Sequence, residues 1–165
     1  MGGVVLDTSV IIKAVLKPGK WLPGSVYERE LETHRKSRLL IRLLNEKGVE
    51  VLIPFAALVE IAGVLTRLVS RDLAMEVVES LRATRSYRIV YEEEIRDHVI
   101  ETALSTGSSG FNTYFIAIAK LYNATLITDD EPMSIRTERV GVNTILVRKT
   151  GTEELIAKIN EISRE

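Results

Sequence analysis

Short apolar runs alternate along the chain with longer segments in which apolar residues recur every three or four positions. The short runs are rich in Val, Ile and Leu, and each has the length of a buried strand. Turn-forming and charged residues separate them from the longer segments. The predicted strands are Gly3–Leu6, Glu50–Ile53, Arg88–Tyr91, Thr125–Thr128 and Thr144–Val147.

The longer segments have the 3.6-residue spacing of helices, and Pro or Gly bounds several of them. Gly48 suits a helix C-cap, Asp72 suits an N-cap, and the stretch between Thr128 and Thr144 is expected to be a turn. Strands alternating with helices predict one α/β domain over residues 1–165, with a mostly parallel sheet of about five strands flanked by helices. The predicted helices are Thr8–Lys17, Glu28–Lys47, Pro54–Ser70, the segment from Asp72 to about Ala83, Glu92–Leu104, Thr113–Tyr122 and Glu153–Ile162.

The amino-acid composition restricts the kinds of functional site that this chain can contain. The 165 residues are 45% apolar, 5% aromatic and 27% charged, with a net charge of -1. Any contact with nucleic acid must therefore use a local basic patch. The absence of cysteine excludes disulfides, zinc–thiolate sites and thiol catalysis. No basic leader precedes the first apolar run and no apolar run reaches membrane-spanning length, so a soluble cytoplasmic protein without a membrane partner is expected.

Acidic residues follow two of the predicted strands and interrupt one apolar helix. Asp7 follows the first strand, Asp129 and Asp130 follow the fourth, and Glu60 lies among apolar residues of the third predicted helix. Side chains at the carboxyl ends of parallel strands converge on one crevice. Carboxylates gathered there need a cation, which predicts a divalent metal site. The simpler alternatives are an N-cap for Asp7, a turn for the Asp129–Asp130 pair, and an ion pair between Glu60 and Arg67.

Asn112, at the start of a predicted helix, is either an N-cap or a neutral oxygen ligand of a hard metal. Ser9 has two interpretations, orienting Asp7 or capping the helix, and we favour capping. His34 and His98, the two histidines, both have the setting of solvated surface residues.

A basic stripe follows one side of the predicted helix Glu28–Lys47. Arg35, Arg38 and Arg42 form it. Such a stripe is typical of a solvated face, and it is also able to contact phosphates.

Four motifs, in order along essentially the whole chain, resemble those of PIN-domain ribonucleases, especially the VapC-type toxins. They are Val4–Ser9, Pro54–Arg67, Phe111–Ala119 and Leu126–Asp130. The resemblance implies a three-layer PIN-like sandwich and a ribonuclease that hydrolyses RNA phosphodiester bonds with Mg²⁺ or Mn²⁺. It also implies an RNA substrate, a VapB-like antitoxin as partner and a homodimer.

The family pattern assigns the catalytic roles to Asp7, Glu60 and Asp130. The expected metal set adds Asn112 and Asp129 to these three, with Asp129 as a helper. Active relatives carry Asp at the position of Asn112, so this site would hold its cation less tightly. The alternative function is therefore a catalytically weakened or inactive PIN-like module that binds RNA or a protein partner.

A phosphatase of the haloacid-dehalogenase type also has an early strand-end Asp and a late pair of Asp residues. That chemistry needs a second acid two residues after the first, where this chain has Ser9. We therefore disfavour it.

Overall fold

The computed structural model describes residues 2–165, in which strands and helices alternate. The strands are β1 (Val4–Leu6), β2 (Val51–Pro54), β3 (Tyr87–Val90), β4 (Thr125–Thr128) and β5 (Thr144–Leu146). The helices are α1 (Thr8–Val15), α2 (Gly24–Lys47), α3 (Phe55–Leu68), α4 (Arg71–Ala83), α5 (Glu92–Thr106), α6 (Phe111–Leu121), α7 (Glu131–Arg139), the short 3-10 helix η1 (Val147–Lys149) and α8 (Thr152–Ile162).

The five strands form one sheet in the order β3-β2-β1-β4-β5, and every neighbouring pair is parallel. The strand β1 is therefore central, between β2 and β4. Leu6 is in register with Ile127, so the residues that follow them, Asp7 and Thr128, meet at the carboxyl edge. The predicted α/β class and central parallel sheet are confirmed.

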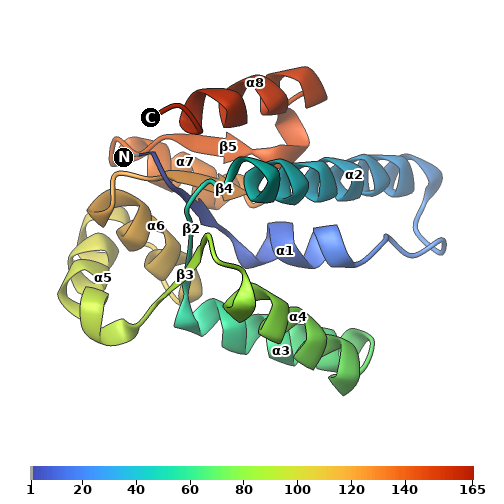
Figure 1. The fold of residues 1–165 in the computed structure, drawn as a ribbon, viewed down its shortest axis with the longest axis horizontal. Helices are drawn as coiled ribbons and strands as arrows, with labels where there is room; N and C mark the ends of the chain where they lie inside the picture. The colour runs from blue at the N-terminus through green and yellow to red at the C-terminus, as the bar shows by residue number, and fades with distance from the viewer. Residues whose placement is uncertain (1) are drawn as a thin grey trace.

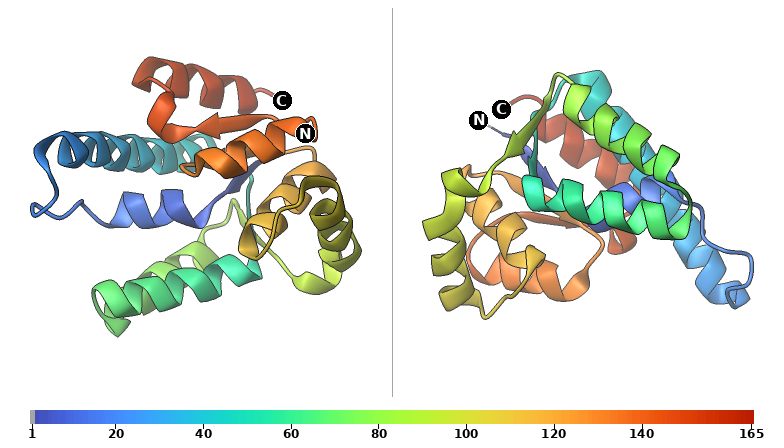
Figure 2. Two further views of the ribbon diagram at one scale, coloured as in Figure 1. Left: turned by 180° about the vertical axis from the view of Figure 1, so that it is seen from behind. Right: turned by 90° about the horizontal axis from the view of Figure 1, so that it is seen from below.

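Helices cover both faces of this sheet. Helices α2 and α8 pack together on one side, and α3 to α6 lie on the other (Figures 1 and 2). Parallel sheets need this double cover because their strands are apolar on both faces. Val5, Leu6 and Ile127 are accordingly shielded completely, and Leu40 of α2 and Ile116 of α6 are equally buried. Helix α1 contacts both α2 and α3 as it leaves the carboxyl edge.

The segment expected to be a turn after β4 contains a helix, α7, and this prediction was wrong. Asp130 caps it by accepting a hydrogen bond from the Met133 N–H at 2.8 Å. Pro132 lies in its first turn, where a proline is tolerated because the first helical N–H groups have no partner within the helix. Its inward side carries Ser134 and Thr137 beside Met133, so the usual apolar spacing is weak.

Several helix boundaries differ from prediction by one to four residues, and two helix starts show why. Helix α2 begins at Gly24 rather than residue 28, because the Tyr27 N–H already bonds the Pro23 carbonyl at 2.8 Å. The N-cap of α4 is Ser70, whose hydroxyl accepts from the Leu73 N–H at 3.1 Å, and Asp72 lies in the first turn. The predicted C-cap at the end of α2 is confirmed.

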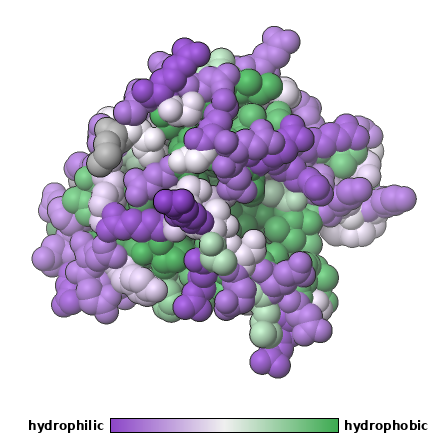
Figure 3. All heavy atoms as spheres, in the orientation of Figure 1, coloured by the Kyte–Doolittle hydropathy of each residue, from purple (hydrophilic) through white to green (hydrophobic). Residues whose placement is uncertain are grey.

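The surface shows a recessed hydrophobic area over α1, framed by hydrophilic side chains of α2 and of the α3–α4 pair (Figure 3). Helices α3 and α4 also expose single apolar side chains, among them Val59, Leu68 and Met75. None of the helices within residues 2–165 combines the length and apolarity needed to cross a membrane.

Candidate functional site

A pocket of about 260 Å³ opens at the carboxyl edge of the sheet, beside its central strand. Helices α1, α3 and α6 supply its walls together with the residues that follow β1 and β4. Its lining consists of Asp7, Thr8, Ser9, Ile12, Lys13, Glu60, Val64, Asn112 and Asp130. The structure thus brings four of the five predicted metal residues together and places Asp129 outside.

The Asp7 carboxylate is buried, with 5% of the residue exposed. One of its oxygens accepts hydrogen bonds from the Ser9 hydroxyl at 2.5 Å and the Thr128 hydroxyl at 2.8 Å. Although Asp7 occupies the N-cap position of α1, its side chain caps nothing. Ser9 orients this carboxylate, so the favoured interpretation of Ser9 as a helix cap was wrong.

Burial raises the pKa of Asp7, and the nearby charge of Glu60 adds to that rise. Hydrogen bonds from Ser9 and Thr128 favour the ionised form, but they offset only part of the cost of burial. Among residues 2–165, no Lys, Arg or His forms an ion pair with Asp7. The carboxylate is therefore ready to gain from a cation that the protein itself does not supply.

Asp129 is buried as deeply, at 3% exposed, but two cations surround it. Arg148 donates from its backbone N–H at 2.9 Å, from Nε at 3.2 Å and from Nη2 at 2.9 Å. Lys13 Nζ forms a further ion pair with the same carboxylate. Burial alone would raise the pKa of Asp129, yet these hydrogen bonds and charges lower it overall.

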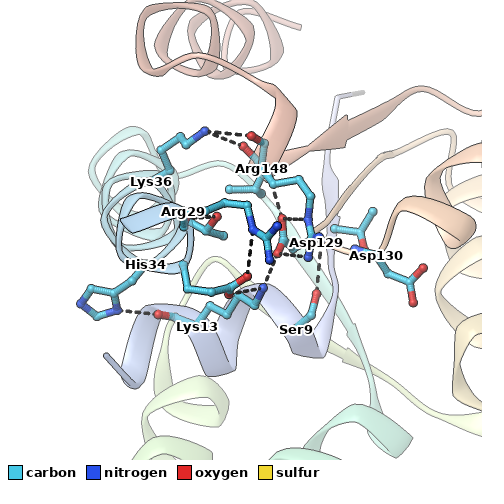
Figure 4. A network of polar contacts seen from close by, with 12 residues as sticks. Ser9, Lys13, Arg29, His34, Lys36, Asp129, Asp130 and Arg148 are labelled. Atoms are coloured by element: carbon cyan, nitrogen blue, oxygen red, sulfur yellow. Dashed lines mark hydrogen bonds and ion pairs between the residues drawn. The ribbon is translucent and has the colours of Figure 1, made fainter. Parts of the chain in front are cut away.

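The neighbouring carboxylates of Asp129 and Asp130 point in different directions (Figure 4). Asp129 faces α1 and the turn before α8, whereas Asp130 lines the pocket. One oxygen of Asp130 accepts the Met133 N–H, which fixes the side chain as the cap of α7. The Asp130 N–H in turn donates to the Thr128 hydroxyl at 3.0 Å. Asp130 is thus connected through Thr128 to Asp7.

A buried lysine holds the turn that presents Arg148. Lys36 of α2 is 5% exposed, and its ammonium donates to the carbonyls of Val147 at 3.0 Å, Arg148 at 3.3 Å and Thr150 at 3.0 Å. The Val147 carbonyl also accepts the Thr150 N–H at 3.3 Å, so the lysine mainly supplies a donor to the carbonyls of Arg148 and Thr150 at the end of this short helix. The network in Figure 4 therefore ties α1, α2, β4 and η1 together around Asp129.

Glu60 and Asn112 face the pocket from opposite helices, α3 and α6, and both are half-buried. The alternative ion pair of Glu60 with Arg67 is not found within residues 2–165. Asn112 is not the N-cap of α6 either. That position belongs to Gly110, whose φ of 60° and ψ of -150° suit only glycine.

A buried hydroxyl in the pocket has no partner. Thr8 is 5% exposed, lines the pocket, and its Oγ1 makes no hydrogen bond within the described structure. A buried polar atom without a partner is costly, so such an atom indicates an absent water or ligand. Asp7, Glu60, Asp130, the Asn112 amide and this hydroxyl together offer the oxygen donors that Mg²⁺ and Mn²⁺ prefer.

Within residues 2–165, no three acidic or histidine side chains approach one another closely enough to form a ready metal cluster. The donor set therefore fits a hydrated cation, because Mg²⁺ keeps several waters and takes only one or two carboxylates directly.

The histidines divide between core and surface. His34, expected to be solvated, is 3% exposed, and its Nδ1 hydrogen-bonds the Lys13 carbonyl at 2.6 Å. That prediction was wrong because α2 packs against α1 at this point. His98 is exposed, as predicted, and so are the three arginines of the basic stripe on α2.

A larger hollow of about 870 Å³ lies at the opposite edge of the sheet, where Gly3, Thr125 and Thr144 begin three of the strands. Among its described lining residues there is neither a buried acid nor an unpartnered buried hydroxyl. The smaller pocket, which has both, is the candidate site.

The chain is similar to known proteins in its sequence pattern and in its fold. The sequence model of the PIN domain family matches residues 4–136. The chain belongs to the PIN domain family. The match includes all four pocket acids and amides that were predicted from the sequence, and it ends before Arg148. No curated protein sequence matches the chain significantly.

Two solved structures share the PIN fold of this chain. VapBC2 from Rickettsia felis, bound to a DNA fragment from their promoter, has a TM-score of 0.58 and 15% identity, covering 88% of this chain and 98% of that one. FitAcB from Neisseria gonorrhoeae has a TM-score of 0.54 and 18% identity, covering 88% and 99%. The predicted VapC-type resemblance is confirmed at the level of the fold.

Proposed function

We propose that this PIN domain is a metal-dependent ribonuclease that hydrolyses RNA phosphodiester bonds in the pocket around Asp7. The observation that carries the proposal is the contrast between two buried acids on adjacent strands. Asp129 has cations of the protein on both oxygens, whereas Asp7 has hydrogen-bond donors but no ion pair within residues 2–165, and its pKa is raised. A buried carboxylate left in this state is typical of a functional site.

The proposed ligand set is Asp7, Glu60, Asp130 and the amide oxygen of Asn112. We leave Asp129 out because Arg148 and Lys13 already use its oxygens. When bound, Mg²⁺ or Mn²⁺ lowers the pKa of a water and offsets the charge that develops on the phosphate.

The residues of the chain position the reacting groups. Ser9 and Thr128 hold one oxygen of Asp7, which leaves the other for the pocket. The Met133 N–H holds one oxygen of Asp130 in the same way. The Thr8 hydroxyl is free to donate to a water or a phosphate oxygen. The carboxylates of Asp7 and Asp130 are thus each fixed through one oxygen, which reduces the entropy lost on binding.

Membership in the PIN family and the likeness to VapBC2 and FitAcB support a role as the toxin of a toxin–antitoxin pair. A VapB-like antitoxin is the proposed protein partner, and a homodimer is the proposed assembly.

The test is cleavage of single-stranded RNA with Mg²⁺ or Mn²⁺, compared with EDTA. We expect cleavage only with the metal, because without it the acidic pocket repels the phosphate. Asp7→Asn should reduce cleavage by more than the roughly 10–100-fold that loss of an outer partner of a metal ligand costs. Asp97→Asn, at an exposed acid of α5, is the matched control and should cleave normally. Undiminished cleavage in EDTA would contradict the proposal.

A second function, an inactive PIN-like module, is favoured by one observation, the amide of Asn112 among the pocket acids. Calorimetry with Mn²⁺ separates the two functions. In the nuclease, the native chain binds Mn²⁺ and Asn112→Asp binds it more tightly, since a charge is added. In the inactive module, the native chain shows no binding and Asn112→Asp creates it.

A further inference from the structure

A second hollow continues from the candidate site along α1. It has a volume of about 170 Å³ and shares Ile12 and Lys13 with the acidic pocket. Its complete lining is Ile12, Lys13, Leu16, Lys17, Pro18, Glu30 and His34. The hollow therefore leads from the acidic pocket to Pro18, where the loop between α1 and α2 begins.

This loop carries the only tryptophan of the chain, Trp21, which is 84% exposed. A side chain at Gly19 would overlap the indole, with an added Cβ only 2.7 Å from Trp21 Cδ1. A turn closed by the Leu22 N–H and the Gly19 carbonyl, at 3.1 Å, holds the two residues together. One side of the ring thus rests against Gly19, while the other faces solvent.

The surroundings of the indole are basic. Lys17 and Lys20 shortly precede it in sequence and are both exposed. Glu30 is the one acid of the second hollow, and it is paired with Lys13 at 2.9 Å and Arg29 at 3.6 Å. The loop projects beyond the end of α1 (Figure 1), so the ring is accessible. In a chain of net charge -1, the indole and these two lysines form a local basic patch.

We propose that a single-stranded RNA leaves the acidic pocket along the second hollow and stacks a base on Trp21, with its phosphates beside Lys17 and Lys20. Aromatic rings bind unpaired bases, and lysines bind the intervening phosphates. A single indole offers far less surface than the roughly 800 Å² that each partner contributes to a stable protein interface. The assignment of RNA rests on the proposed function, which places the scissile phosphate at the other end of the path.

Tryptophan fluorescence tests the proposal directly, because Trp21 is the one tryptophan and all tryptophan emission comes from it. The probe is a single-stranded oligoribonucleotide of about ten nucleotides in EDTA, so that metal-dependent cleavage is absent and binding reports Trp21 and its lysines rather than the acidic pocket. We expect saturable quenching that weakens as salt increases. Lys17→Gln and Lys20→Gln should weaken binding, and Lys47→Gln, at an exposed lysine near the end of α2, should not.

A pair of glycine variants controls for folding. Gly19→Ala displaces the indole and should weaken RNA binding on the order of tenfold. Trp21→Ala should weaken it as much, and because this variant has no tryptophan its binding is followed by the anisotropy of a dye-labelled oligoribonucleotide. Gly24→Ala, a few residues away, introduces a methyl group with no atom within 4 Å and should bind as the native chain does. Equal binding by Gly19→Ala and Gly24→Ala would overturn the proposal.

Cleavage kinetics separate this proposal from the nuclease proposal. For the long oligonucleotide, Trp21→Ala should raise KM on the order of tenfold and leave kcat unchanged, because Trp21 is not among the residues that line the acidic pocket. A dinucleotide is too short to reach the loop and should show no difference. Quenching without any cleavage would contradict the proposed nuclease activity but not the binding of a base by Trp21. Cleavage without quenching would contradict only the binding of a base by Trp21.

Discussion

Asp7 and Asp129 follow adjacent strands of the same sheet, and their surroundings differ in one respect. Both are almost fully buried, at 5% and 3% exposed. Around Asp129 the chain supplies Arg148 and Lys13, and the pKa falls. Around Asp7 it supplies hydrogen bonds and the like charge of Glu60 in the same pocket, and burial raises the pKa.

The contrast shows that burial alone does not determine the role of a carboxylate. With its cations in place, Asp129 joins β4 to α1 and η1 and stabilises the fold. Asp7 keeps the cost of its burial, which binding of an external cation would relieve. Residues arranged for function commonly carry such a cost, and stability is then gained by removing them.

The largest expected effect on stability comes from Asp129→Asn. It removes the charge between Lys13 and Arg148 and should lower the free energy of unfolding by about 2–3 kcal/mol. The cost is at the lower end for a buried pair because both cations retain some exposure, 25% and 32% of their side chains. Urea unfolding in EDTA measures it. An unchanged midpoint would show that the ion pairs contribute nothing.

Asp7→Asn should have the opposite sign. At neutral pH without metal, it removes a buried charge and should stabilise the protein by about 1 kcal/mol, a common gain when a functional site is relieved. An Asn oxygen can still accept from Ser9 and Thr128. The same unfolding experiment with Mn²⁺ added should reverse the order, because only the native chain gains from the metal. Destabilisation in EDTA would contradict the comparison.

The free energies of unfolding of the two variants should depart from that of the native chain in different pH ranges. The folded pKa of Asp129 lies below its usual value of 3.8, so its contribution is present above that value and is lost as the pH falls through the folded pKa. The folded pKa of Asp7 lies above 3.8, so its contribution is present below that value and is lost as the pH rises through the folded pKa.

Unfolding of the two variants and the native chain in EDTA, from about pH 3 to pH 8, tests these signs. The deficit of Asp129→Asn should shrink toward acid, and the gain of Asp7→Asn should grow toward neutral pH. If the free energy of unfolding changed with pH in the same way for all three proteins, the proposed difference between Asp7 and Asp129 would be contradicted.

The smallest effect is expected at Ser9, which contacts both acids. Its hydroxyl donates to Asp7 and accepts the Asp129 N–H at 3.2 Å. Ser9→Ala should cost about 0.5–1 kcal/mol, the usual value of one hydrogen bond, and should raise the pKa of Asp7 further. NMR titration of the Asp7 carboxyl measures that pKa. Ser105→Ala on exposed α5 is the control and should leave it unchanged.

The sequence predicted the sheet well because β1 and β2 are continuous apolar runs, and the other strands each contain two or three consecutive apolar residues. It missed α7 because the inward side of that helix carries Ser134 and Thr137, which leave no apolar stripe. A helix that buries polar residues against a sheet lacks the apolar spacing by which helices are predicted from sequence.

The site was predicted in part, because convergence at a strand edge follows from topology while the direction of each side chain does not. Asp129 and Asp130 are adjacent residues of the same type, and only the family resemblance favoured Asp130 as the catalytic acid. Their partners decide between them, and Arg148 and Lys13 lie 19 and 116 residues from Asp129. No local pattern contains that information. Thr8 was missed for a similar reason, since an unpartnered hydroxyl is recognised only once its surroundings are known.

Arg148 lies outside residues 4–136, the part of the chain that defines the family. A fragment cut at that boundary would retain every recognisable motif, yet it would lose β5 from the sheet edge and the guanidinium that neutralises Asp129. It would also leave Lys36 without the three carbonyls that its ammonium binds. The segment that matches the family, residues 4–136, is therefore shorter than the segment needed for a stable fold. Expression of the domain should extend through α8.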